Sequence, residues 1–113
     1  MGSYPQLDRY LRLEERQDIA DGAGGFVETW VPRGNHWASV SARSGGGKTL
    51  EFGAASTLSL RITVREAPQG HPARPAPGER FVDGVRIYLI QAVHEADEAP
   101  GYLICFAQEE KAL

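Results

Sequence analysis

The segment that decides the fold is Thr57-Leu58-Ser59-Leu60-Arg61-Ile62-Thr63-Val64-Arg65. Apolar and polar residues alternate through it without a break, and several of them are β-branched. Successive side chains of a β-strand point to opposite faces of the sheet. The segment therefore predicts a strand with one face in the core and the other in solvent.

Two segments nearer the C-terminus have no polar face. Residues 85–93 and 102–108 carry apolar side chains at both odd and even positions, which is typical of strands at the centre of a sheet or in a closed barrel. Asp83-Gly84 lies between apolar runs and predicts a type I′ hairpin turn, with positive φ at both central residues. The acidic segment 94–101 predicts the loop between the two strands.

The N-terminal half predicts further short strands separated by turns. Strands are expected over residues 10–17, 26–31 and 37–42. The glycine-rich residues 21–25 predict a tight turn after the first of these strands. A second turn, at residues 32–35, is expected to separate the other two.

Glycine and proline set the overall fold class. The 113 residues include 13 glycines and 7 prolines, so short elements interrupted by turns are expected. Residues 67–78 hold four of the prolines and predict an irregular loop, and only residues 48–55 suit a short helix. The expected fold is all-β: a small antiparallel β-barrel or sandwich of about six to seven short strands, with long loops and at most one short helix. We expect one domain over residues 1–113, with a flexible N-terminus at residues 1–6.

The composition excludes several classes of protein. No run approaches the roughly 18 to 20 apolar residues that span a bilayer, and the first residues lack a secretory signal pattern. We therefore expect no membrane partner and synthesis in the cytoplasm. The formal net charge of -3 does not favour binding to nucleic acid through its phosphates. The single cysteine, Cys105, is expected to be a small buried hydrophobe rather than a nucleophile.

No motif predicts catalysis, a cofactor or a metal site. Residues 42–49, Ala-Arg-Ser-Gly-Gly-Gly-Lys-Thr, resemble a phosphate-binding loop. Such a loop joins a buried parallel strand to a long helix, and neither is expected here, so a flexible glycine loop is the better interpretation. The histidines His36, His71 and His94 lie far apart in or beside expected loops, without the spacing of metal ligands.

Arginine and tryptophan are the candidates for interfaces. Arginines outnumber lysines ten to two. Arginine suits subunit interfaces, and a GC-rich genome also raises its frequency, so both explanations stay open. Trp30 and Trp37 either fill the core at one end of the barrel, which we favour, or anchor a partner surface.

The order of these features resembles the head–tail joining family of tailed bacteriophages, whose members are also called head-closure, connector or stopper proteins. The resemblance covers roughly residues 7–110 and depends on the series D-x-x-G-G, W and W-A-x-V in this order. The residues that carry it are Leu11, Leu13, Gly24, Gly25, Trp30, Trp37, Ala38, Val40, Gly84 and Ile90.

The resemblance implies a β-barrel that assembles with copies of itself into a ring, with six-fold rather than twelve-fold symmetry. The ring would lie in the neck of a virion or of a phage-like gene transfer particle, between the portal–adaptor complex and the tail. It would close the DNA channel after packaging and dock the tail terminator or tube, and double-stranded DNA would pass through its lumen without sequence recognition. The alternatives are a neighbouring neck or tail component (adaptor, tail terminator or tube protein) and a stand-alone OB- or SH3-like binding module.

Two sets of residues are candidates for contacts within such an assembly. An arginine-bearing strand edge would face the Glu14-Glu15 or Glu109-Glu110 cluster of a neighbour. The glycine loop would project toward the channel or the adjoining ring. That loop comprises Arg43, Ser44, Gly45, Gly46, Gly47, Lys48 and Thr49.

Overall fold

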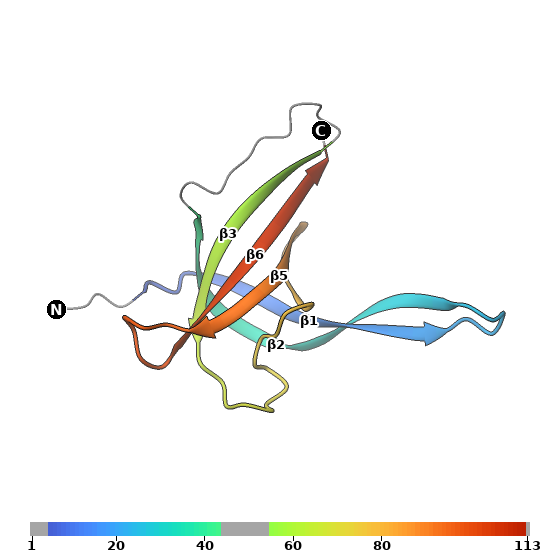
Figure 1. The fold of residues 1–113 in the computed structure, drawn as a ribbon, viewed down its shortest axis with the longest axis horizontal. Helices are drawn as coiled ribbons and strands as arrows, with labels where there is room; N and C mark the ends of the chain where they lie inside the picture. Colours follow the sequence, from blue (N-terminus) through green and yellow to red (C-terminus); the bar gives the residue numbers. More distant parts are fainter. Residues whose placement is uncertain (1–4, 44–54, 113) are drawn as a thin grey trace.

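Six antiparallel β-strands close into a barrel in the computed structural model of this protein, which describes residues 5–43 and 55–112 (Figure 1). The order around the barrel is β1-β2-β3-β6-β5-β4, and pairing of β4 with β1 closes it. The described residues contain no helix, so the all-β prediction is confirmed. The strands are β1 (Arg9–Ala20), β2 (Phe26–Ala42), β3 (Ala55–Arg65), β4 (Arg80–Asp83), β5 (Arg86–Glu95) and β6 (Tyr102–Ala112).

The core fills the inside of the barrel, and the predicted alternation in β3 supplies part of it. Leu60, Ile62 and Val64 point inward and are each at most 3 % exposed. β3 pairs with β6 along its whole length and with β2 over its second half. The buried cluster consists of Leu11, Leu13, Ala38, Leu60, Ile62, Val64, Phe81, Tyr88, Ile90, Leu103, Cys105 and Ala107.

The second apolar face of β5 lies on the outside of the barrel. Tyr88 and Ile90 are buried in the core, whereas Ile87 and Leu89 on the opposite face are 43 % and 41 % exposed. The prediction that this strand belongs to a closed barrel is confirmed. The expectation that it would lack a solvent-facing side is wrong, because the barrel has one layer and only its inner face is covered.

Strand β2 is one continuous strand of 17 residues, so the predicted turn at residues 32–35 is wrong. The pairing of β1 with β2 shifts by one residue at this point: Leu13 opposes Gly34, Glu14 opposes Pro32, and Arg33 has no opposite residue. This shift is a β-bulge, a position where a sheet tolerates proline. The bulge fuses two expected strands into one, which reduces the number of strands to six.

The hairpin between β4 and β5 has a different turn from the predicted type. The paired residues are Asp83 and Arg86, so the two central residues are Gly84 and Val85. Gly84 has a φ of 62°, and no residue other than glycine has a positive φ in the described part of the chain. Positive φ at the first central residue alone is the pattern of a type II′ turn, so the type I′ prediction is wrong.

The proline-rich segment between β3 and β4 is irregular, as predicted, and one histidine fastens it to the barrel. His36 lies in β2 and donates a hydrogen bond from Nε2 to the carbonyl oxygen of Ala73, 2.6 Å away. Its ring also meets the ring of Phe81 edge-on, with centroids 5.9 Å apart. The expectation that His36 would be an exposed loop residue is wrong. The predicted helix at residues 48–55 falls outside the described residues except for Ala55, which begins β3.

The partly buried position of His36 should make the free energy of unfolding depend on pH. Burial lowers the pKa of His36, and its hydrogen bond to Ala73 offsets this only in part. The unfolded chain therefore binds a proton more readily than the folded chain, and the free energy of unfolding should fall as the pH decreases from 7 through the ordinary histidine range. His36→Gln should reduce this fall in urea titrations at pH 7 and pH 5. The exposed His94→Gln is the control, and equal pH dependence of both variants and the native protein would contradict the assignment.

Candidate functional site

The most distinctive feature is a two-stranded arm that extends from the barrel (Figure 1). Strand β4 pairs with β1 only at residues 12–14, and β3 pairs with β2 only at residues 38–42. Within the part of the chain that the structure describes, residues 15–20 and 26–31 therefore pair only with each other. We call residues 15–31 the arm. The arm gives the molecule its elongated extents of 58 × 40 × 21 Å.

The turn at the end of the arm is built as its sequence predicts. One carboxylate oxygen of Asp21 accepts hydrogen bonds from the backbone N–H groups of Ala23, at 2.7 Å, and Gly25, at 3.0 Å. These bonds lower the pKa of Asp21, so the carboxylate stays charged at neutral pH. Gly22 and Gly24 have φ values of 82° and 90°, a region that favours glycine. The turn is therefore a defined structure and not an arbitrary loop.

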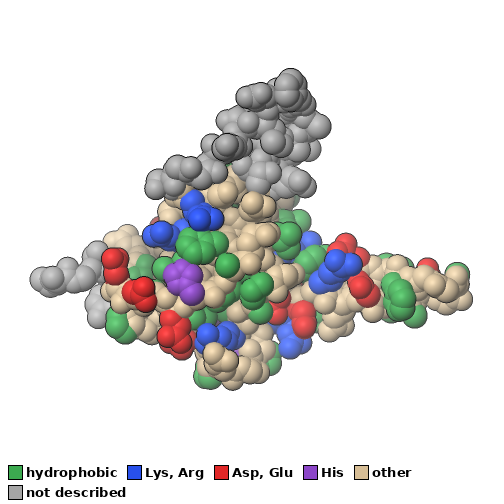
Figure 2. Space-filling model, in the orientation of Figure 1, with side chains coloured by type: hydrophobic (Ala, Val, Ile, Leu, Met, Phe, Trp, Pro, Cys, Tyr) green, Lys and Arg blue, Asp and Glu red, His purple; other side chains and the backbone are tan. Residues whose placement is uncertain are grey.

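Apolar side chains are exposed at the end of the arm. Phe26 is 73 % exposed, and the cross-strand pair Ile19 and Val27 is 51 % and 53 % exposed. Figure 2 shows hydrophobic side chains on the projecting arm beside a group of acidic and basic ones. A hairpin of two strands is at best marginally stable alone in water, and clustered exposed apolar residues mark contact surfaces. We call these three residues the arm tip. Ile19 and Val27 share one face of the arm, and Phe26, opposite Ala20, lies on the other face. Both faces of the arm therefore expose apolar area that is suited to contact another surface.

The arm is also acidic. It contains Arg16 as its one basic residue and four carboxylates, a formal charge of -3. Asp18 and Glu28 lie opposite each other on the two strands, and both form ion pairs of 3.2 Å with Arg16. Two carboxylates thus share one guanidinium, so the arm has negative charge that its own residues do not neutralise.

A buried charge cluster joins the base of the arm to the barrel. Glu14 is 5 % exposed and accepts hydrogen bonds from Arg12, at 2.7 Å, and Arg80, at 2.8 Å. Burial raises the pKa of Glu14, but the two guanidinium groups outweigh it and bring the pKa below its ordinary value. Arg80 also lies over the ring of Trp30, 4.1 Å from its centroid. The Arg80 side chain of β4 therefore contacts both Glu14 and Trp30 at the base of the arm.

The glutamates that were expected to face a neighbouring subunit are engaged within the chain. Glu14 is held by Arg12 and Arg80, and Glu15 forms an ion pair of 3.3 Å with Arg33. Glu109 accepts two hydrogen bonds of 2.8 Å from Arg86. These three carboxylates therefore have partners within the chain, and their contact with a neighbouring copy stays a prediction. The Glu110 side chain lies outside the described part.

Neither tryptophan fills the core, so the favoured interpretation of Trp30 and Trp37 is wrong. Trp30 is partly buried beneath Arg80 at the base of the arm. Trp37 is 52 % exposed on the outside of the barrel, where its ring centroid lies 4.9 Å from that of Tyr10. The alternation in β2 places His36 and Ala38 on the inner face, and Trp37 between them must point outward.

The other predicted site residues are distributed over the fold. Leu11, Leu13, Ala38 and Ile90 belong to the core, and Val40 is partly buried against it. Gly24 and Gly25 lie in the turn of the arm, and Gly84 lies in the β4–β5 turn. In the proposed channel loop, Arg43 follows β2 and its guanidinium lies 4.4 Å from the ring centroid of Phe106. Ser44, Gly45, Gly46, Gly47, Lys48 and Thr49 lie outside the described residues.

The described residues show no catalytic arrangement. Cys105 is fully buried, and burial raises the pKa of its thiol to about 12, so the reactive thiolate does not form at neutral pH. Its prediction as a small buried hydrophobe is confirmed. In residues 5–43 and 55–112, no group of three or more His, Cys, Asp or Glu side chains could hold a metal ion. The same residues include no helix that is long and apolar enough to cross a membrane.

Comparisons with known proteins agree with this picture of an assembly component. A family model described as phage head completion protein matches residues 3–110. A chain in the solved structure of the virion of a native gene transfer agent particle is 44 % identical, with a TM-score of 0.81, over 97 % of this chain and 100 % of that chain. No curated protein matches the sequence. The chain therefore belongs to the phage head completion protein family, and its role is a structural one at the head and neck of a phage-like particle.

Proposed function

We propose that this protein forms a ring of identical copies in the neck, between the portal–adaptor complex and the tail. In this position it closes the DNA channel after packaging and docks the tail terminator or tube, without enzymatic activity. The family membership and the similarity to a chain of a gene transfer agent virion support this proposal. The observation that carries it is the arm, because a subunit that functions alone has no use for exposed apolar side chains on a projecting hairpin.

A ring requires two different, complementary surfaces on each subunit. The barrel provides a rigid body whose strands are all paired, and the arm provides a surface that stands away from this body. The arm tip offers apolar area of the kind that protein interfaces bury. Each copy can therefore reach its neighbour through the arm while its barrel keeps its fold.

The charge of the protein is compatible with a channel through which DNA moves. A subunit that neutralised many phosphates would hold the DNA tightly, in a salt-dependent manner. The formal net charge of -3 works against such binding, so DNA can pass without being retained by the wall. Residues 43–49 stay our proposal for the contact with the channel or with the adjoining ring.

Replacing the arm tip with polar residues tests this function. The triple variant Ile19→Thr, Phe26→Thr and Val27→Thr places β-branched threonine at three exposed strand positions outside the barrel, so the barrel should fold with an unchanged melting temperature. Each removed side chain is expected to contribute about 1.5 kcal/mol or more when buried at an interface. The yield of DNA-filled, tailed particles should therefore fall more than about 100-fold, because this loss occurs at every interface of the ring.

The matched control removes apolar surface elsewhere. Val85 is 98 % exposed in the β4–β5 turn, and Leu89 is 41 % exposed on the outer face of the barrel. Val85→Thr with Leu89→Thr should leave the particle yield within a few-fold of the native value. A normal yield from the arm-tip variant, or an equal loss from the control, would rule out the role we assign to the arm.

A further inference from the structure

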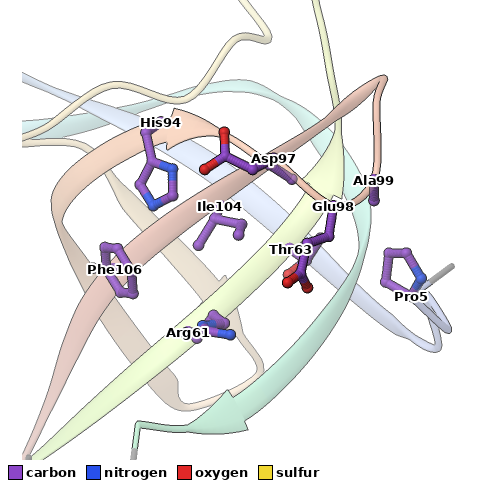
Figure 3. A pocket seen from close by; sticks show the side chains of 10 residues that line it. Pro5, Arg61, Thr63, His94, Asp97, Glu98, Ala99, Ile104 and Phe106 are labelled. Carbon is purple, nitrogen blue, oxygen red and sulfur yellow. The ribbon is translucent and has the colours of Figure 1, made fainter. Parts of the chain in front are cut away.

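The outer face of the barrel has a groove across β3, β6 and β5, with a volume of about 370 Å³ (Figure 3). The apolar side chains of Ile104 and Phe106 on β6 lie at its centre. Arg61 on β3 lies on one side, and His94 on β5 with Asp97 in the following loop lies on the other. The groove therefore has an apolar centre between a basic side and an acidic side.

The basic side of the groove holds Arg61, and Arg43 lies over the same ring, that of Phe106. Seven of the ten arginines form ion pairs with carboxylates of their own chain. Arg43, Arg61 and Arg65 form none with the described residues, and all three are exposed. The guanidinium groups of Arg43 and Arg61 lie 4.4 and 5.8 Å from the ring centroid of Phe106. Unneutralised positive charge is thus concentrated beside the apolar centre of the groove.

The arm has the complementary properties. It carries a formal charge of -3. The Asp18–Glu28 pair is next along the ladder to the Ile19–Val27 pair, with its side chains on the opposite face of the arm. The arm cannot reach the groove of its own chain, because its turn and the β5–β6 loop lie at opposite ends of the longest axis (Figure 1). Only the arm of another copy can enter the groove, and such a contact joins unlike surfaces head to tail, as a ring requires.

We propose, on the basis of the ring assembly above, that the arm of one copy docks in the β3–β6–β5 groove of the next. Ile19 and Val27 of the arm tip cover Ile104 and Phe106, and the net negative charge of the arm lies close to Arg43 and Arg61. A DNA backbone is a poorer occupant for two reasons. The centre of the groove is apolar, and Asp97 and Glu98, which also line it, would repel phosphate.

Cysteine cross-linking in assembled particles tests this contact. A chain with Val27→Cys in the arm and Thr63→Cys in the groove should give a ladder of covalent multimers with a short bismaleimide. Native Cys105 does not interfere, because its thiol is buried and protonated. The control chain combines Val27→Cys with Val85→Cys in the β4–β5 turn and should give no ladder.

The other outcomes separate this inference from the proposed function. A dimer from Val27→Cys alone would show tip-to-tip contact and would overturn the docking. Normal particles without the Val27–Thr63 product would also overturn it, while leaving the ring in the neck intact. Linkage of a photoreactive group at Thr63→Cys to packaged DNA would assign the groove to DNA instead. Absence of the protein from the neck would refute the proposed function itself.

Discussion

Replacing Arg80 with leucine should lower the free energy of unfolding by about 3 kcal/mol and loosen the arm from the barrel. Arg80 is 2.8 Å from the Glu14 carboxylate, whose side chain is 7 % exposed. Removing one partner from a buried ion pair typically costs about 3–5 kcal/mol, and we expect the lower value because Arg12 still contacts Glu14. Loss of the guanidinium also frees the ring of Trp30. Urea titration should show the lost stability, and Trp30 fluorescence in a Trp37→Phe background should report the looser arm.

The loss of stability in Arg80→Leu should depend on pH. In the native protein the pKa of Glu14 lies below its ordinary value, although burial alone raises it, because Arg12 and Arg80 prevail. The native ion pair therefore stabilises the fold at neutral pH and loses this effect as the pH falls. Without Arg80, burial raises the pKa of Glu14, and protonation then favours the folded form. The stability difference between the native and Arg80→Leu proteins should shrink from pH 7 to pH 4. A difference that stays constant or grows would contradict this account.

Replacing Phe81 with alanine should cost about 3–5 kcal/mol, the usual range for a large aromatic residue removed from a core. Phe81 is fully buried and lies between Leu13 of β1 and Tyr88 of β5 in the ladder. Its strand, β4, has four residues but is the one that closes the barrel. The cavity should therefore open the barrel at β4 first. Hydrogen exchange should show faster exchange in residues 80–83 than in β3 and β6.

The control for Phe81 is a large apolar residue on the outer face. Ile87, on the neighbouring strand, is 43 % exposed, and Ile87→Ala should lower the free energy of unfolding by about 1 kcal/mol or less. Equal losses from the two variants would mean that the inner face of β4 is not part of the core. Faster exchange spread evenly over all strands would show that β4 is not the first strand to separate.

The sequence alone predicted the strands whose apolar residues follow a clear pattern. The alternation in residues 57–65 predicted β3 and its buried face, and the apolar segments predicted β5 and β6 in a closed barrel. The loop at residues 67–78 was also predicted, because proline excludes regular pairing there. In these places local preference and tertiary contact favour the same structure.

The errors arise where long-range pairing decides the structure. Pro32 and Gly34 have the composition of a turn, but pairing with β1 keeps β2 continuous and places the surplus residue in a bulge. Trp30 and Trp37 were expected in the core because large aromatic residues usually are, and the register of β2 directs Trp37 outward. The resemblance identified the protein family, but it did not predict that part of β1 and β2 projects from the barrel as an arm. The sequence indicated strands around residues 21–25 without showing that their outer halves lack neighbouring strands.

The bulge at Arg33 has a consequence for the compatibility of related chains. A bulge bends its strand and increases the local twist, so this one surplus residue sets the direction in which the arm leaves the barrel. A relative without it would hold the same arm at another angle. In the ring that we propose, two such proteins made in one cell should not mix, even with all their other residues in common, because their arms would leave the barrel in different directions. Each particle type would thereby keep its own components.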